Sequence, residues 1–471
     1  MWVDRLTAAA PALWAVMALA FAAARSFWGD EWNHVQDILN HGVMGAALEL
    51  LKKPSPFHPG EALLNGFFWK TLGLFNVPAE VWARAQGILW GTLTVALGAR
   101  LARQEPRRLR VLPWLLFFSA ALLSYAAEMR PYASLFYSGA LCATVLWEQR
   151  LAKGLPRLGA WLLIFSGHLY GICFLVVCLL WVGRGRRHWP EVLIGVTVVF
   201  GVLTSIHITA EQGIAPWDGV FQISRQILGT WANPHRVTLL YGPLAAWGGW
   251  MGWRSTELRR KTLLIVLFMM GAALLPLAAT IYSKYFFVPR QMAAGTAPFL
   301  LLCALGAQSL RRKTVIAALL ICAVGSWSAV YLLKRPPFVS QPFHRFKEVA
   351  QDIAQSKTSD VLFLDVCNRG PFEDYFSRHF KIAGYIDQAS LGGGLSFDKK
   401  CWFKSWPGEE TVCVTFLMDY SFCTKPAEML AVDQPLGRAL RSREFQKVIH
   451  GYQQDPVRYA PEYAGRFVRD W

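Results

Sequence analysis

The chain has 471 residues, of which 54 % are apolar and 17 % are charged, and its mean hydropathy is +0.29. Soluble domains usually carry about 25 % charged residues, so this composition excludes an ordinary cytosolic enzyme. Apolar runs near twenty residues recur from Leu6 to Leu333, most of them with Arg or Lys at one end. Such runs are typical of helices that cross a bilayer core of about 30 Å.

The net charge of +17 lies mainly in the apolar part of the chain. Residues 334–471 contain 19 basic and 17 acidic residues, a net charge of only +2. The sequence has no basic and aromatic stripe of the kind that follows a nucleic-acid backbone, so no nucleic-acid partner is expected.

Five basic clusters between the apolar runs orient the protein. By the positive-inside rule we expect all five to be cytoplasmic, which puts the N-terminus in the cytoplasm and the C-terminal region outside it. They are Arg100/Arg103/Arg107/Arg108/Arg110, Arg150/Lys153/Arg157, Arg184/Arg186/Arg187, Arg254/Arg259/Arg260/Lys261 and Arg311/Arg312/Lys313.

The first apolar run, Leu6 to Phe27, is predicted to be an uncleaved membrane anchor, although the small residues Ala20 to Ala24 could mimic a signal-peptidase site. The first extracytoplasmic loop is then long, residues 28–81. Its apolar stretch from His58 to Phe75 cannot be a full span, because the following basic loop would then lie outside. It also carries Glu61, Asn65 and Lys70, so we expect an interfacial or re-entrant amphipathic helix.

The segment between Arg157 and Arg184 has cytoplasmic ends, but its roughly 26 residues give only about 39 Å of helix, too little for two crossings. The sequence therefore predicts two short half-helices that meet inside the membrane. Gly167, His168, Tyr170 and Gly171 should lie near the apex, where irregular backbone is tolerated only beside a protein-enclosed or wet cavity.

Together with the anchor and the half-helix pair, the remaining spans make about eleven transmembrane helices. The predicted fold is an all-α polytopic membrane domain over residues 1–333, with no visible repeat. The remaining spans are Trp82 to Ala99, Val111 to Ala126, Pro131 to Trp147, Val192 to Ala210, Val237 to Trp253, Leu263 to Tyr282, Met292 to Leu310 and Thr314 to Leu333.

Residues 334–471 are predicted to form a small extracytoplasmic α/β domain. His344 to Gln355 reads as an amphipathic helix, and Asp360 to Val366 and Thr411 to Leu417 read as strands. The five cysteines outside this domain lie in the spans and are expected to pack as small apolar residues. The four in this domain allow up to two disulfides in three connectivities, and the sequence does not choose among them: Cys367, Cys401, Cys413 and Cys423.

Two adjacent carboxylates, Asp30 and Glu31, follow the first span at the outer membrane boundary. Acidic residues there are costly unless they are paired, solvated or used. Asp30 could simply cap an interfacial helix that starts at Glu31. The functional alternative is a carboxylate base, with Glu31 orienting Asp30 or helping it to hold a divalent metal.

Cationic residues are also expected on the outer side. Arg130 lies between Glu128 and Pro131-Tyr132, and Lys284 and Arg290 flank an aromatic segment. Arg130 could pair with Glu128, and the other two could snorkel to head groups. Otherwise the three cations would bind a phosphate, with His58, Glu128, Tyr132, His168 and Tyr170 lining the substrate pocket. His168 alone would more often be a hydrogen-bonded interior histidine.

The order of these motifs resembles the C-type glycosyltransferase superfamily, in particular the bacterial family-39 type related to protein O-mannosyltransferases and aminoarabinose transferases. The motifs are Asp-Glu after the first span, His58-Pro59, Arg84 at the next span, Glu128-x-Arg130-Pro131-Tyr132 and the late Pro289-Arg290. The sequence departs from the pattern at Gly60, where a second proline is frequent, and at Gln291, where tyrosine is usual.

The resemblance implies that a sugar moves, with inversion, from a polyprenyl-phosphate donor to an acceptor hydroxyl at the outer face of a bacterial plasma (inner) membrane. Asp30 would be the general base, and Arg130, Lys284 and Arg290 would stabilise the departing phosphate. A divalent metal is left open, and the acceptor is a glycan, lipid or protein hydroxyl. A lipid flippase or transporter and a phosphoethanolamine-type phosphotransferase remain as alternatives.

Overall fold

The computed structural model of the chain describes residues 2–25, 29–52, 59–129, 132–182, 188–205, 231, 238–283, 289–310, 312–333, 360–363, 381–385 and 414–417. The chain divides into two compact units. The larger unit holds residues 1–24 and 35–342, and the smaller one holds residues 25–34 and 343–471.

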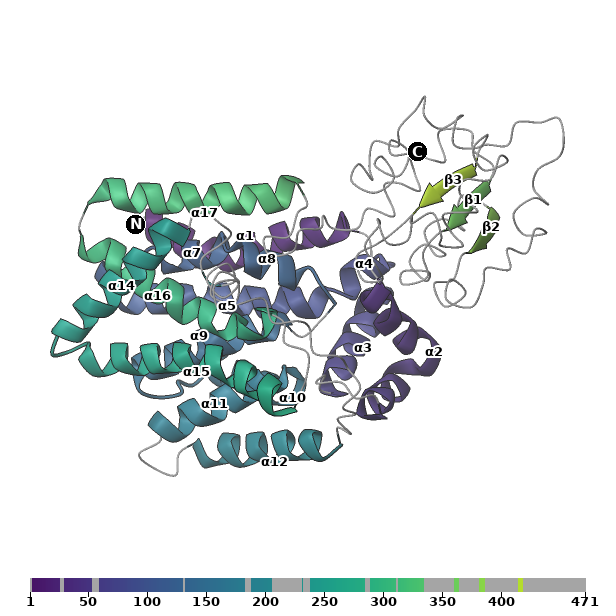
Figure 1. Cartoon of the computed structure of the whole chain (residues 1–471), viewed down its shortest axis with the longest axis horizontal. Coiled ribbons are helices and arrows are strands. Elements are labelled where there is room, and N and C mark those ends of the chain that lie inside the picture. The colour runs from purple at the N-terminus through teal and green to yellow at the C-terminus, as the bar shows by residue number, and fades with distance from the viewer. Residues whose placement is uncertain are drawn as a thin grey trace, which may run out of the picture. The chain divides into compact units, whose positions relative to one another are not determined.

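The larger unit is helical, and its helices pack side by side, with α17 and α12 along opposite edges (Figure 1). Its elements are α1 (Trp2–Ala23), the part of α2 (Gly29–Lys52) from Val35 onward, α3 (Pro59–Gly73), α4 (Ala79–Trp82), α5 (Ala85–Gln104), α6 (Pro106–Leu109), α7 (Leu112–Phe117), α8 (Ala120–Ala126), α9 (Tyr132–Glu148), α10 (Leu155–Ser166), α11 (Leu169–Val182), α12 (Trp189–Ser205), α14 (Thr238–Arg254), α15 (Arg259–Ser283), the 3-10 helix η3 (Pro289–Gly295), α16 (Thr296–Ser309) and α17 (Lys313–Leu333).

Most predicted spans coincide with one helix, but the predicted span Val111 to Ala126 is wrong as a single helix. It breaks into α7 and α8 at Phe118 and Ser119. Ser119 has an extended backbone, and its side chain accepts a hydrogen bond from the N–H of Leu122. The serine thus starts a new helix, because its hydroxyl satisfies a backbone donor of the first turn.

The first predicted loop contains two substantial helices, α2 and α3. The α2 helix is kinked at Gly42, whose φ of 67° is readily adopted only by glycine. Beyond the kink, α2 packs on α3 so closely that a Cβ on Gly66 would lie 2.4 Å from Val43. Further along α3, the Trp69 ring lies 6.2 Å from the ring of Trp82 in α4.

The burial of side chains on α3 differs from that expected for an interfacial helix, whose apolar side would be covered. Glu61 and Asn65 are 2 % and 3 % exposed, whereas Leu63 and Phe67 are 42 % and 58 % exposed. The helix therefore buries its polar stripe in the protein and presents an apolar stripe outward.

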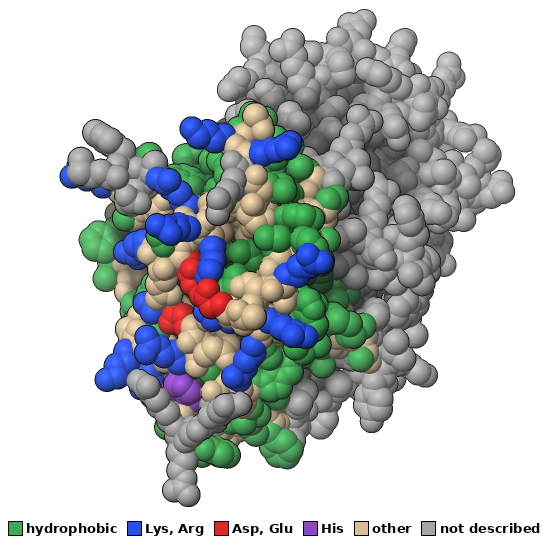
Figure 2. Space-filling model, turned by 90° about the vertical axis from the view of Figure 1, so that its left-hand side faces the viewer, with side chains coloured by type: hydrophobic (Ala, Val, Ile, Leu, Met, Phe, Trp, Pro, Cys, Tyr) green, Lys and Arg blue, Asp and Glu red, His purple; other side chains and the backbone are tan. Residues whose placement is uncertain are grey.

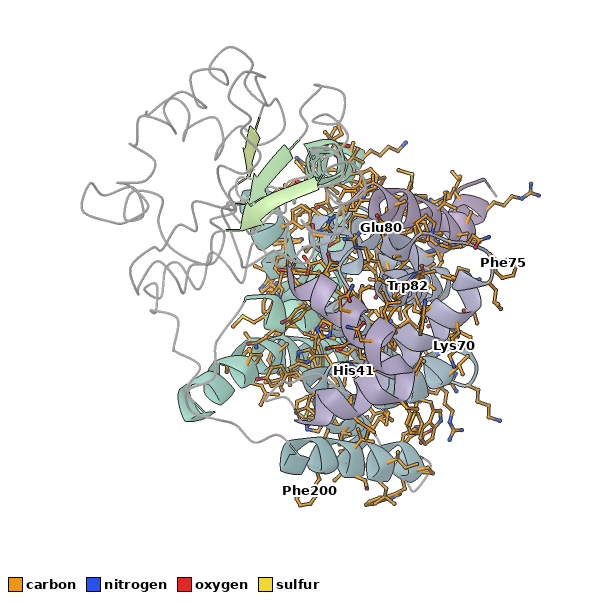
Figure 3. All side chains as sticks on the ribbon, turned by 90° about the vertical axis from the view of Figure 1, so that its right-hand side faces the viewer. His41, Lys70, Phe75, Glu80, Trp82 and Phe200 are labelled. Carbon is orange, nitrogen blue, oxygen red and sulfur yellow. The ribbon has the colours of Figure 1, made fainter. Side chains whose placement is uncertain are left out.

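Large apolar side chains are exposed on many helices. Phe75 after α3 and Phe200 of α12 are 78 % and 68 % exposed, and both project from the helices in Figure 3. Val16 of α1, Leu158 of α10 and Ile321 of α17 are similarly exposed, at 64 %, 68 % and 71 %. Apolar exposure on this scale is typical of surfaces that meet lipid or another protein.

Two helical segments of the described residues are long and apolar enough to cross a membrane, Arg5–Ala23 and Gln291–Ser309. Four shorter apolar helices are Leu155–Ser166, Leu169–Val182, Trp189–Gly201 and Lys313–Ser328. Length and composition alone do not separate such helices from buried helices of soluble proteins, so the number of spans stays a prediction.

In the smaller unit, three parallel strands form a sheet in the order β2 (Lys381–Tyr385), β1 (Asp360–Phe363) and β3 (Val414–Leu417). The strands β1 and β3 lie within the two segments predicted to be strands. The apolar run of β1 fits its central place, because a central parallel strand is usually covered on both faces. The predicted helix His344 to Gln355 and the four cysteines of this region lie outside the described residues.

The five cysteines of the helical unit are free thiols. Cys142, Cys178 and Cys303 are buried, as expected for small apolar packing residues, while Cys173 and Cys322 are partly exposed.

Candidate functional site

The helix break predicted near Gly167 is confirmed, since α10 ends at Ser166 and α11 begins at Leu169. Side chains from two other helices satisfy backbone groups at the break. The Ser134 hydroxyl of α9 accepts a hydrogen bond from the His168 N–H (2.8 Å), and the Gln86 amide of α5 donates to the Ser166 carbonyl (3.3 Å). Helix ends leave such groups unpaired, so these bonds fix the break between α5 and α9.

The His168 side chain is oriented by the backbone of Tyr170. The Tyr170 N–H donates to His168 Nδ1 at 3.2 Å. Because a nitrogen that accepts a hydrogen bond carries no proton, the neutral imidazole has its proton on Nε2. The structure thus holds His168 as a donor through Nε2.

Aromatic rings surround this imidazole. The ring centroid of Tyr132 lies 5.7 Å from that of His168, and the Tyr170 centroid lies 5.3 Å from it. Tyr125 at the end of α8 is 6.1 Å from Tyr132. We call Tyr132, His168 and Tyr170 the His168 cluster; the structure brings these three predicted pocket residues together.

Glu128 lies in the turn that follows α8, where its N–H donates to the carbonyl of Tyr125 at 3.3 Å. Its side chain is half-buried, and Oε2 is inaccessible to solvent. The link through Tyr125 places Glu128 at the same end of the helices as the His168 cluster.

Arg84, which precedes α5, is fully buried, and its guanidinium donates to the carbonyl of Ala22 at 2.8 Å. Ala22 belongs to the last turn of α1, where carbonyls lack helical partners and the helix dipole favours a cation. Arg84 therefore joins the end of α1 to the start of α5. Gln86, two residues later, was not singled out in the sequence; its only signal is an amide in the first turn of an apolar helix.

At the start of α2, Glu31 is fully buried. The helix begins at Gly29, so Asp30 lies within the first turn, and the alternative of a cap before a helix starting at Glu31 is wrong. A carboxylate in a first turn still interacts favourably with the helix dipole. The side chain of Asp30 lies outside the described residues.

The predicted phosphate-binding cations also fall largely outside the description. Arg130 and Lys284 are not among the described residues, and only the backbone of Arg290 is, in η3. The predicted pocket residue His58 also lies outside the described residues. That 3-10 helix packs on α9, the helix that carries Tyr132. The convergence of Asp30, Arg130 and Arg290 on one site stays a prediction.

The predicted basic clusters meet at the other end of the helical unit. Arg100 pairs with Glu148 at 2.8 Å, Arg108 with Glu257 at 2.7 Å, and Arg157 with Glu191 at 2.6 Å. The first two pairs join the first cluster to the neighbours of the second and the fourth, and the third pair joins the second cluster to the start of α12. The helix α16, which leads to the fifth cluster, packs on α6 within the first. Figure 2 shows this basic face, with Lys and Arg side chains around a small acidic group.

The helix α9 relates the two ends, because it carries Tyr132 and Ser134 at its start and Glu148 at its last residue. Its 17 residues correspond to about 25 Å of helix. The His168 cluster and the basic face are therefore separated by nearly the thickness of a bilayer core, about 30 Å.

Within the described part of the chain, no group of three His, Cys, Asp or Glu side chains could hold a metal ion. The side chain of Asp30, which with Glu31 would be the ligand pair if a metal binds, lies outside the described residues.

No protein-family model matches the sequence, and no curated protein sequence matches it either. Among solved structures, the chain is similar to crystal structures of ArnT from Cupriavidus metallidurans. The apo form has a TM-score of 0.48 at 13 % identity, covering 92 % of this chain and 95 % of that chain. A form bound to undecaprenyl phosphate has the same TM-score and identity, with coverage of 89 % and 93 %.

Proposed function

We propose that this protein is a membrane glycosyltransferase that moves a sugar from a polyprenyl-phosphate donor to an acceptor hydroxyl at the extracytoplasmic face. The observation that carries the proposal is the placement of the His168 cluster and Glu128 at the helix ends remote from the basic face. By the positive-inside rule the basic face is cytoplasmic, so the cluster belongs to the outer leaflet, where a lipid-linked donor is accessible.

The membrane location has separate support in the exposed apolar side chains of α1, α3, α10, α12 and α17. In this arrangement the N-terminus is cytoplasmic and residues 334–471 are extracytoplasmic. A bacterial plasma membrane is the expected compartment.

In the proposed reaction, the acceptor oxygen attacks the anomeric carbon of the donor. The new carbon–oxygen bond forms as the bond to phosphate breaks, and the bonding electrons leave with the polyprenyl phosphate. Asp30 takes the hydroxyl proton as general base, and attack opposite the phosphate inverts the anomeric centre. Arg130, Lys284 and Arg290 stabilise the charge that grows on the phosphate.

The His168 cluster contributes a hydrogen-bond donor and aromatic surfaces to this site. His168 offers Nε2–H because Nδ1 already accepts from Tyr170. Such a donor suits a phosphate or sugar oxygen, and the tyrosine rings suit the apolar face of a sugar. The proposed roles of His58, Glu128, Tyr132 and Tyr170 are to line this pocket, and Glu31 positions Asp30.

The proposal is tested by supplying the purified protein with labelled polyprenyl-phosphate sugars and an acceptor mixture from bacterial envelopes. Asp30→Asn should lower transfer by about 100-fold or more, the usual worth of a general base, while donor binding is retained. Glu257→Gln on the basic face is the matched control and should transfer like the wild type. Undiminished turnover by Asp30→Asn would remove the base assignment.

A further inference from the structure

The inner stripe of α3 holds polar atoms that no hydrogen bond from the described residues satisfies. Glu61 Oε2 and Asn65 Oδ1 are buried and, among the described residues, have no hydrogen-bond partner. The same holds for Oε1 of Gln86 in α5, which is 3 % exposed. Buried polar atoms are nearly always hydrogen-bonded, and leaving one unpaired is destabilising.

These three residues belong to elements that pack on one another. Glu61, Asn65 and Trp69 follow one another at a spacing of four residues, which forms a stripe along one side of α3. Trp69 contacts Trp82, four residues before Gln86. The helix α3 also packs on α10 and α5, the two helices that the Gln86–Ser166 hydrogen bond connects beside His168.

The amide oxygens of Asn65 and Gln86 accept hydrogen bonds, and the Glu61 carboxyl accepts them and, when protonated, also donates one. A carboxylate or phosphate ligand would bring further acceptors and is disfavoured. Burial raises the pKa of Glu61, because the charged form is poorly solvated in the protein interior. Hydroxyl groups, which donate hydrogen bonds without charge, are the complementary ligand.

We infer that Glu61, Asn65 and Gln86 form a subsite that recognises the hydroxyl groups of a neutral sugar carried by the polyprenyl-phosphate donor. The inference rests on the proposed function and names the part of the donor that α3 binds. It separates two tasks: the cations of the site hold the phosphate, whereas the inner stripe of α3 distinguishes a neutral sugar from an acidic one.

The test compares the affinity of the full chain in nanodiscs for undecaprenyl phosphate, for a polyprenyl-phosphate hexose and for a polyprenyl-phosphate uronic acid. Glu61→Leu removes the accepting oxygens, whereas Glu61→Gln keeps one at nearly the same position. Lys70→Gln, on the exposed side of the same helix, is the control.

We expect Glu61→Leu to weaken hexose-lipid binding by about five- to tenfold, the worth of one hydrogen bond, and to change undecaprenyl phosphate binding less than about twofold. Glu61→Gln and Lys70→Gln should stay close to the wild type. The wild type should prefer the hexose over the uronic acid. If Glu61→Leu does not fold, Asn65→Leu, which removes the accepting oxygen of the next residue in the stripe, serves in its place with the same expectation.

The outcomes separate the two proposals. The sugar subsite is overturned if Glu61→Leu loses affinity equally for undecaprenyl phosphate and the hexose lipid, or loses affinity for neither. It is also overturned if the wild type binds undecaprenyl phosphate and the hexose lipid with equal affinity. A wild type that binds none of the three lipids contradicts the proposed function itself, and the subsite with it.

Discussion

Two carboxyl side chains show how strongly position governs charge in this protein. Glu257 is exposed and accepts two hydrogen bonds from Arg108, at 3.0 and 2.7 Å, and this pairing lowers its pKa. Glu61 is buried without such a partner among the described residues, and burial raises its pKa. The anionic form of the same functional group is therefore favoured on the basic face and disfavoured on α3.

This contrast predicts opposite responses of stability to pH. A carboxyl with a raised pKa binds more protons in the folded state than in the unfolded state, so its contribution to stability falls as pH rises above the ordinary value of 4.5. We therefore expect Glu61→Gln to gain thermal stability relative to the wild type as pH increases, measured by melting in detergent from about pH 4 to about pH 8.

Glu257→Gln should behave in the reverse sense. A lowered pKa adds stability above the unfolded pKa that is lost as pH falls, so this variant should be less stable than the wild type at neutral pH and equal to it in acid. A melting difference for Glu61→Gln that does not change with pH would show that its carboxyl titrates normally.

Two helices, α14 and α16, approach each other closely at two glycines. A Cβ on Gly248 would lie 2.0 Å from the carbonyl oxygen of Leu302, and one on Gly306 would lie 2.1 Å from that of Leu244. Small residues of this kind let helix backbones touch, which is a common basis of helix association in membranes.

The neighbouring glycine gives this packing a matched test. A Cβ on Gly249 would meet nothing within 4 Å. Gly248→Ala should destabilise the protein by about 1–3 kcal/mol, because the backbones must separate. Gly249→Ala should be neutral or stabilising by up to about 1 kcal/mol, since alanine favours the helix. Equal unfolding free energies of the two variants would contradict the close packing of α14 on α16.

The sequence predicted where helices form better than it predicted which side of each helix is buried. The requirement that the basic clusters lie on one side of the membrane was enough to predict a break near Gly167, because two full crossings do not fit between Arg157 and Arg184. It could not show that Ser119 interrupts a continuous apolar run, since one serine rarely ends a helix. Nor could it show that Glu61 and Asn65 point inward, because a polar stripe fits water and a protein interior equally well.

The candidate site was predictable only in part. His168, Tyr132 and Tyr170 stand out as polar residues beside a predicted break, and the structure brings them together. Gln86 and Arg84 act through bonds to carbonyls far away in the sequence, at Ser166 and Ala22. No local pattern reports such a partner, so their structural roles emerge only from the fold.

For the molecule as a whole, the arrangement of its charges predicts a fixed orientation in the membrane. In a background without cysteine, Arg107→Cys on the basic face should react with a membrane-impermeant thiol reagent only after cells are permeabilised. Phe75→Cys, whose position is 78 % exposed in the first predicted outer loop, should react in intact cells. The readout is the fraction of protein labelled.

The reverse labelling pattern would invert the orientation and remove the His168 cluster from the outer leaflet. Reaction of both positions in intact cells would contradict the separation of the two faces by the bilayer.

The short pair α10 and α11 has a consequence for biosynthesis. In the predicted topology both ends of the pair are cytoplasmic, so neither helix can insert into the bilayer without the other. The translocation machinery must accept both as a single hairpin whose tip never reaches the far aqueous phase. Because Ser134 and Gln86 belong to helices made earlier, the docking site for that tip is already synthesised when the hairpin emerges from the ribosome.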